Sequence, residues 1–190
     1  MQFITYKGQK FEVSDNALIL GNHGIKEISK IIGLKELLNL KALYLFNNKI
    51  SEIRDLDNLI NLEKLNLYGN QIKQVKNLDH LIKLNTLFLS ENKIEEIKGL
   101  SKLKNLQNLS FEDNQISEIK GLKRLIKLRK LNLYGNKISE IKGLKNLRNL
   151  IELRIGNNQI PQEVLKKCGG IDSSGYANNP KLFVRFCIKN

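Results

Sequence analysis

The residues of this chain that commonly carry out catalysis are few. There are two histidines, His23 and His80, and two cysteines, Cys168 and Cys187. Neither histidine has a nucleophile or a set of metal ligands at a recognisable spacing, and two cysteines alone do not form a structural zinc site. Segment 21–24 (GNHG) matches neither of the phosphate-binding patterns GxxxxGK[ST] and GxGxxG. The sequence therefore predicts a protein that is not an enzyme, with no cofactor and no metal site.

Both cysteines lie close to the C-terminus, so they are candidates for neighbours in space. The chain starts without the apolar stretch of a signal peptide, and its apolar runs are far shorter than the roughly 20 residues that span a bilayer. We therefore expect a cytoplasmic protein without a membrane span, in which Cys168 and Cys187 are reduced and buried. A disulfide between them is the alternative, and counting free thiols on unfolded, unreduced protein distinguishes the two states.

All the remaining side chains are positioned by an internal repeat. Leucine recurs every 22 residues, at Leu40, Leu62, Leu84, Leu106, Leu128 and Leu150. Asparagine recurs with the same period, at Asn48, Asn70, Asn92, Asn114, Asn136 and Asn158. Six copies of LxxLxLxxNxIxxIxxLxxLxx are thus in register, and a divergent seventh copy with three extra residues precedes them.

Each repeat is predicted to contain a strand and a returning segment. The LxxLxL half alternates with period two, which indicates a short strand with its leucines pointing inward. The IxxIxxLxxLxx half spaces apolar residues by three, which suits tight 3₁₀-like turns or an irregular segment. Successive strands then stack in parallel, about 4.8 Å apart. The asparagine at each strand end turns inward, where its amide pairs with backbone groups that the bend leaves free.

This pattern resembles the leucine-rich repeat superfamily, in particular the 22-residue class typified by the regulatory subunit of type-1 protein phosphatase and by bacterial internalins. The resemblance implies an α/β fold: a right-handed solenoid in a horseshoe arc, with a parallel concave sheet and short 3₁₀ or irregular convex segments. We expect one domain over residues 1–190, with seven repeats in 15–165 between caps at 1–14 and 166–190. We call the outer surface of the parallel sheet the sheet face.

The two caps have their own sequence signals. A stack of coils exposes apolar surface at each end and needs a cover. Segments 3–6 and 11–13, joined by a Lys-Gly turn, predict a β-hairpin. Pro161 begins a predicted short helix that two glycines end after Cys168. The run 182–187 (LFVRFC) predicts a final strand or an extended cover.

The remaining function is non-covalent binding, and the candidate binding residues lie on the sheet face. The chain has five Tyr, seven Phe and no Trp, and five of these aromatics fall at strand positions that point out of the sheet. They are Tyr44, Phe46, Tyr68, Phe88 and Tyr134. The first four come from three consecutive strands, which predicts one patch roughly 10–15 Å across. Contiguous exposed aromatics are typical of protein interfaces; the alternative is β-propensity with cross-strand contacts.

Charged side chains continue this predicted site beyond the aromatic patch. Glu91, Glu112 and Asp113 lie at strand ends, and Arg154 lies further along. The chain has 32 Lys and Arg against 19 Asp and Glu, a formal net charge of +13, yet the sheet face is close to neutral. Most of the positive charge lies on the returning segments, densest at Lys102, Lys104, Lys123, Arg124, Lys127, Lys145 and Arg148.

We therefore predict a monomeric, non-enzymatic interaction module, a scaffold or regulator that binds a protein partner on the sheet face. One alternative is binding of RNA or an anionic surface through the basic C-terminal flank, although that flank has no interleaved aromatics for base stacking. Nucleic acid is therefore the less favoured partner. A second alternative is an internalin-like adhesin, which requires a secretion signal.

Overall fold

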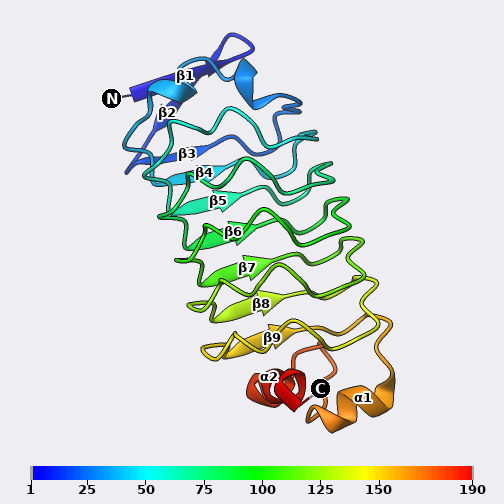
Figure 1. Cartoon of the computed structure of the whole chain (residues 1–190). Helices are drawn as coiled ribbons and strands as arrows, with labels where there is room; N and C mark the ends of the chain where they lie inside the picture. Colours follow the sequence, from blue (N-terminus) through cyan, green and yellow to red (C-terminus); the bar gives the residue numbers. More distant parts are fainter. Residues whose placement is uncertain (1, 190) are drawn as a thin grey trace.

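The computed structural model describes residues 2–189. The chain begins with an antiparallel hairpin, continues as a stack of coils whose strands form one parallel sheet, and ends with two helices (Figure 1). The hairpin strands are β1 (Gln2–Tyr6) and β2 (Gln9–Val13). The sheet strands are β3 (Ala17–Ile19), β4 (Ala42–Tyr44), β5 (Lys64–Asn66), β6 (Thr86–Phe88), β7 (Asn108–Ser110), β8 (Lys130–Asn132) and β9 (Glu152–Arg154). The predicted leucine-rich solenoid with terminal caps is confirmed.

The strands follow one another in the sheet in sequence order, and their register matches the repeat. Leu43 of β4 pairs with Leu65 of β5, which pairs with Leu87 of β6. Residues 22 positions apart are therefore side by side. Each column of the repeat becomes a row of neighbouring side chains running across the sheet.

Tight turns form the returning segments, as the three-residue spacing predicts. After β4, the Leu59 amide donates to the Leu56 carbonyl (3.0 Å), and the Leu62 amide donates to the Leu59 carbonyl (2.9 Å). The later repeats have the same pair of bonds. Within residues 2–189, 3₁₀ helices occur only in the first repeat, as η1 (Ile28–Lys30) and η2 (Leu34–Glu36). That repeat has three extra residues, which lengthen its returning segment.

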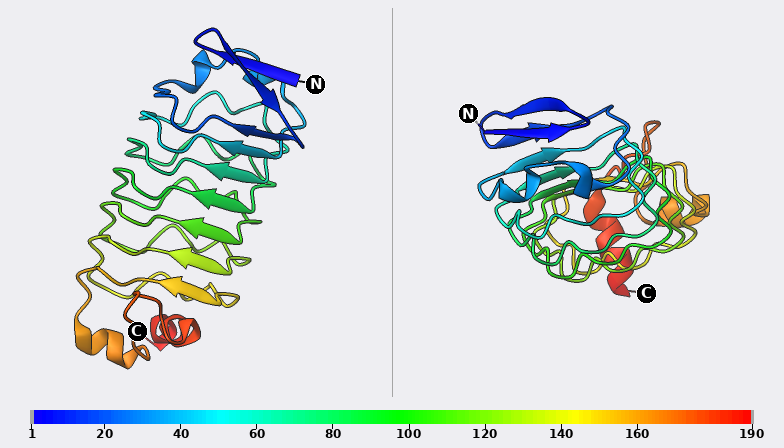
Figure 2. Two further views of the ribbon diagram at one scale, coloured as in Figure 1. Left: turned by 180° about the vertical axis from the view of Figure 1, so that it is seen from behind. Right: turned by 90° about the horizontal axis from the view of Figure 1, so that it is seen from above.

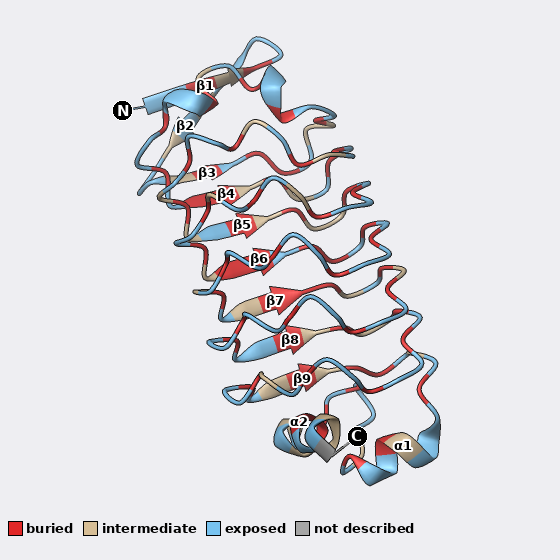
Figure 3. Ribbon diagram, in the orientation of Figure 1, coloured by how far each residue is buried: buried red, intermediate tan, exposed pale blue. Residues whose placement is uncertain are grey.

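The core fills the inside of the coils. The leucines and isoleucines of the repeat are almost fully buried, on both the strands and the returning segments (Figure 3). Phe111 takes the place that Leu89 and Leu133 hold in the neighbouring coils, and none of its surface is exposed. Because adjacent coils share this core, each coil depends on its neighbours for burial.

The asparagine column turns inward, as predicted. Asn92 is representative, because its Oδ1 accepts a hydrogen bond from the Ile72 amide (2.9 Å). Its Nδ2 donates to the Leu67 carbonyl one coil away (2.9 Å) and to the Leu89 carbonyl of its own coil (3.1 Å). Equivalent bonds recur along the column. Each side chain thus connects the backbones of adjacent coils, and no buried side-chain polar atom among the described residues lacks a partner.

The predicted N-terminal hairpin is present and covers the first coil. Ile4 and Tyr6 are buried against the core. The Thr5 amide donates to the Ile32 carbonyl (2.8 Å), and the Ile32 amide donates back to the Thr5 carbonyl (2.9 Å). The hairpin and helix α2 therefore close opposite ends of the stack (Figure 2).

One element of the C-terminal cap differs from its prediction. Helix α1 (Gln162–Lys167) confirms the short helix after Pro161. Residues 182–187, predicted as a strand or extended cover, instead lie within helix α2 (Pro180–Lys189), so that prediction is wrong.

The residues before this run explain why it is helical. Pro180 takes the first helical position, where its missing N–H removes no helical hydrogen bond. Asn179 caps the helix, and its Oδ1 accepts a hydrogen bond from the Lys181 amide (3.1 Å). Phe183 and Val184 are buried, with Cys187 one turn further on and half-buried. These residues are spaced by three and four positions, as on one face of a helix. The spacing is hard to recognise in the sequence because neighbouring residues of the run are also apolar.

None of the helices within residues 2–189 is long and apolar enough to cross a membrane.

Candidate functional site

The two histidines have structural contacts. The His23 ring meets the Phe11 ring edge-on, with 4.7 Å between their centres, and joins the first coil to the hairpin. His80 Nε2 lies 2.9 Å from the Leu56 carbonyl of the previous coil. Each ring therefore connects elements of the solenoid.

Both thiols lie in the C-terminal cap, where Cys168 is buried, as predicted, and Cys187 is only half-buried. Cys168 is fully buried, and burial raises the pKa of its thiol to about 11, with a further contribution from Cys187. Burial also raises the pKa of the Cys187 thiol, whose Sγ lies 3.4 Å from the Ile141 carbonyl. The two residues are free thiols in this structure. Reactive cysteines have a lowered pKa, and burial moves the pKa of both of these thiols in the opposite direction.

The first row of the predicted site crosses the N-terminal half of the sheet face. The register places Tyr44, Asn66 and Phe88 side by side. The two aromatics are therefore two strand spacings apart, about 10 Å. Phe88 is 38% exposed and Tyr44 is half-buried. Phe88 thus places a large apolar side chain on the sheet face. The paired position on the next strand, β7, has the small residue Ser110.

The second row lies two residues further along each strand and includes Phe46 and Tyr68. The Phe46 ring covers the backbone of Gly21 in the first coil, because a Cβ added there would lie 2.2 Å from the ring. Gly21 is therefore required beneath the ring. Phe46 has a packing role that the repeat pattern alone does not reveal, since the unit does not specify a glycine at this position.

Tyr68 is held by the next coil. Its hydroxyl donates a hydrogen bond to Glu91 Oε1 (2.6 Å). This bond, followed by desolvation and the nearby carboxylates, raises the pKa of Tyr68 above its usual value of 10.0. The ring is therefore fixed in orientation, and the hydroxyl stays protonated well above neutral pH.

We expect Glu91→Gln to lower the pKa of Tyr68 toward 10.0, because the neutral amide no longer opposes the negative charge of a tyrosinate. An NMR titration of ¹³C-labelled tyrosine rings measures this shift. Glu63→Gln is the control, since Glu63 pairs with Lys41 elsewhere on the sheet (3.8 Å), and it should leave the Tyr68 curve unchanged. An identical Tyr68 pKa in wild type and Glu91→Gln would show that the hydrogen bond does not form in solution.

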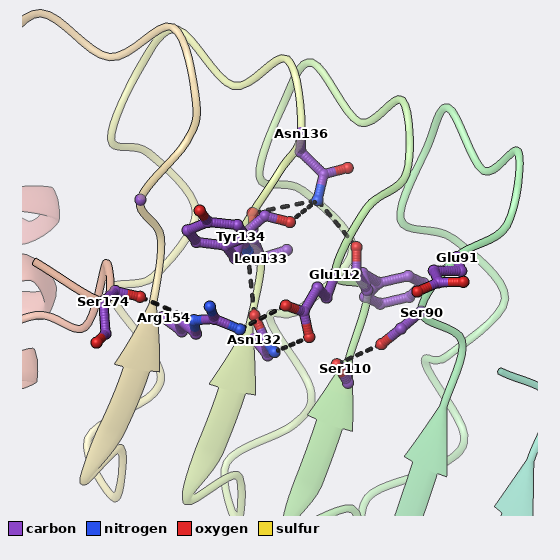
Figure 4. Close-up of polar contacts among 12 residues, drawn as sticks. Ser90, Glu91, Ser110, Glu112, Asn132, Leu133, Tyr134, Asn136, Arg154 and Ser174 are labelled. Carbon is purple, nitrogen blue, oxygen red and sulfur yellow. Dashed lines mark hydrogen bonds and ion pairs between the residues drawn. The ribbon is translucent and has the colours of Figure 1, made fainter. Parts of the chain in front are cut away.

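A polar network occupies the C-terminal half of the sheet face (Figure 4). Arg154 of β9 forms an ion pair with Glu112, two coils away. Asn132 of β8 lies between them, and its Nδ2 donates to Glu112 Oε2 (2.9 Å). Arg154 Nε also donates to the Ser174 carbonyl of the C-terminal cap (2.9 Å). Through Arg154, Glu112 and Asn132 the network therefore connects three consecutive coils, and Arg154 joins it to the cap.

Two tyrosine rings surround the same guanidinium. Its central carbon lies 4.0 Å from the centre of the Tyr134 ring and 5.4 Å from that of Tyr176, distances at which cation–π attraction contributes. Tyr176 belongs to a segment that runs antiparallel beside β9, and its backbone forms a bridge with Arg154. From its place in the sequence, Tyr176 is expected only in the cap. No periodic signal places it on the sheet face, because it follows the last repeat.

Asp113 lies near two other carboxylates of the sheet face, those of Glu112 and Glu91. Burial, followed by the charges of Glu112 and Glu91, raises the pKa of its carboxyl, and Arg154 opposes this effect. The Asp113 side chain forms no ion pair within residues 2–189, whereas Glu112 is neutralised by Arg154. Asp113 is therefore an exposed carboxylate without an ion-pair partner among the described residues.

Small polar residues separate the two halves of the face. Ser90 and Ser110 are buried despite their outward direction, and their Oγ atoms lie 2.7 Å apart. Thr86 of β6 is also buried and accepts a hydrogen bond from Asn108 Nδ2 (3.3 Å). The exposed Phe88 ring therefore lies beside small, buried polar side chains on its own strand and on β7.

Comparison with known proteins agrees with this architecture. A family model described as leucine-rich repeats (two copies) matches three consecutive segments, residues 38–80, 82–124 and 126–167. A search of curated proteins finds no match.

Solved structures with the same fold include two internalins and the functional domain of InlJ, all from Listeria monocytogenes. Internalin C2 is 34% identical, with a TM-score of 0.61, and the match covers 77% of this chain and 73% of that one. The internalin InlF is 23% identical (TM-score 0.58), and the match covers 82% of this chain and 52% of that one. The functional domain of InlJ is 24% identical (TM-score 0.63), with coverage of 76% and 31%. The chain thus spans about half of InlF and a third of InlJ.

Proposed function

Because the chain belongs to the leucine-rich repeat family, whose folds are interaction modules generally without catalysis, we propose that it binds a protein partner on its sheet face. The contact would centre on Tyr68 and Phe88 and extend to the charged network around Arg154. The observation that carries this proposal is Phe88, a large aromatic that is 38% exposed in the middle of the sheet. Exposed aromatics of this kind are frequent energetic centres of protein interfaces.

The rigidity of these side chains favours binding. Tyr68 is held by Glu91, and Arg154 is held by Glu112 and the Ser174 carbonyl. Side chains that are already ordered lose little conformational entropy on association. Their strands belong to a continuous sheet, so the spacing between the two halves of the site is also set before a partner arrives.

Charge defines which partner surface would fit. Asp113 and Glu91 are exposed carboxylates near the aromatic side chains, while the nearby cation Arg154 is already paired with Glu112. A complementary partner would therefore present an apolar side chain to Phe88 and a basic side chain to Asp113.

We expect Tyr68→Ala with Phe88→Ala to abolish capture of the partner from a lysate of the source organism, because truncation of one central aromatic weakens binding by about thirtyfold. Quantitative mass spectrometry of proteins retained by the immobilised chain measures the loss. The matched control is Ile60→Ala with Ile82→Ala, which removes two exposed apolar side chains from the returning segments.

Retention of a protein by wild type and control, with loss by the aromatic variant, supports the sheet-face site. Asp113→Arg should also weaken retention of that protein, since it reverses the charge that a basic partner would meet. Equal capture by wild type and by the aromatic double variant would refute the proposal.

A further inference from the structure

A second candidate site lies on the C-terminal flank, away from the aromatic residues. It is a hollow of about 380 Å³, where the last returning segments enter their strands and meet the C-terminal cap. This volume falls within the range of small-ligand sites, about 300–1,000 Å³. The hollow is lined by Gln107, Lys127, Arg129, Arg148, Asn149, Ile151 and Lys181.

Four of the lining side chains are cations, and none of the lining residues is acidic. Within residues 2–189, Lys127, Arg129, Arg148 and Lys181 form no ion pair at 4.0 Å or less. Lys127 makes only a neutral contact, in which its Nζ donates to Asn105 Oδ1 (2.8 Å). Four positive charges thus surround one hollow without internal neutralisation.

The C-terminal hollow can be compared with a second hollow at equivalent repeat positions. This second hollow, of about 410 Å³, lies on the same flank of the N-terminal coils. There, Glu63 occupies the repeat position of Arg129 and pairs with Lys41 (3.8 Å). Lys83 occupies the position of Lys127 and makes the same kind of amide contact, to Asn61 Oδ1 (2.6 Å). The same backbone geometry therefore forms both hollows, and only the C-terminal one has a concentrated, unpaired charge.

The cap completes the C-terminal hollow. Lys127 and Arg148 come from successive returning segments, and Arg129 immediately precedes β8. Lys181 comes from the first turn of α2 and reaches this flank because the helix covers the last coil. A basic returning surface alone, as the sequence predicts, would not include Lys181.

We propose that this hollow binds a compact polyanion with at least two phosphate groups. The planar guanidinium groups of Arg129 and Arg148 can each donate two parallel hydrogen bonds to phosphate oxygens. Lys127 and Lys181 add point charges on either side, and Ile151, 53% exposed, forms an apolar wall. A phosphorylated lipid headgroup and a soluble polyphosphate share this chemistry.

Isothermal titration with tripolyphosphate tests the site directly. We expect one saturable site that weakens as NaCl increases. Arg129→Gln with Arg148→Gln should weaken binding at least roughly tenfold, because two charge-assisted contacts are lost. Lys181→Gln alone should also weaken it, although Lys181 is distant in sequence from the other cations. The control with the same loss of charge is Lys49→Gln with Lys93→Gln, two exposed lysines of other repeats.

Vesicles with and without phosphatidylinositol bisphosphate distinguish the two sources. Vesicle binding that is lost in the arginine variant identifies a headgroup, and tripolyphosphate binding alone identifies a soluble ligand; both outcomes support the site. Absence of saturable tripolyphosphate binding would overturn the proposal. Equal weakening by the arginine variant and the lysine control would also overturn it, as would a preference for random-sequence RNA that both variants reduce alike.

Discussion

We expect Phe111→Ala to lower the free energy of unfolding by about 3–5 kcal/mol, the cost of removing a fully buried aromatic side chain and leaving a cavity. Phe111 has no exposed surface and is the largest side chain in its row of the core. Its backbone is held independently, because its amide donates to the Asn132 carbonyl (2.8 Å). The substitution therefore removes packing and keeps the ladder of the sheet. Total stability of small domains is about 5–15 kcal/mol, so the effect is a large fraction of it.

Urea denaturation followed by circular dichroism measures this loss. Phe111→Leu is the control, since leucine is the residue at the same position in the adjacent coils, at Leu89 and Leu133. It should cost about 1–2 kcal/mol, because most of the volume remains filled. If the alanine and leucine variants unfold at the same urea concentration, the Phe111 ring does not fill the core in the way the structure shows.

We expect Asn92→Ala to destabilise the fold by at least about 3 kcal/mol, because several buried backbone groups lose their partner at about 1–3 kcal/mol each. The Ile72 amide and the Leu67 and Leu89 carbonyls all bond to this one side chain. Water cannot replace it at little cost, since Asn92 is only 8% exposed.

Asn149→Ala is the matched control for that substitution. Asn149 also donates its amide to a carbonyl of the previous coil, that of Ile126 (2.8 Å), but it does so at the exposed flank. Water can solvate the freed carbonyl there, so we expect a loss below about 1 kcal/mol. Equal unfolding free energies for the Asn92 and Asn149 variants would contradict a structural role of the buried column.

Much of the fold follows from one periodic pattern. The period-two leucines of Leu43 and Leu45 specify strands, and the three-residue spacing of the following half specifies turns, because each spacing matches one backbone geometry. The inward asparagines are equally predictable, since the bend after each strand leaves backbone groups that need partners. The same repeat predicts that successive strands stack in parallel, and the strand pairing confirms it, with Tyr44 beside Asn66 and Asn66 beside Phe88.

The caps are less predictable because they occur once. The run 182–187 contains closely spaced apolar residues that fit a strand as well as a helix. The deciding signals lie outside it, in the helix-capping Asn179 and the helix-starting Pro180. Tertiary packing then selects the helix, which buries Phe183 and Val184 against the last coil.

The candidate sites are likewise predictable where the repeat forms them and not where the cap contributes. The coil, its core, its asparagine column and the outward rows that contain Tyr68, Phe88 and Glu112 can be predicted from the repeat, because the repeat specifies contacts between residues 22 apart. The position of Arg154 between Tyr134 and cap residues, and that of Lys181 in the basic hollow, became visible in the folded chain. These contacts depend on the path of a non-repetitive cap, which no periodicity specifies.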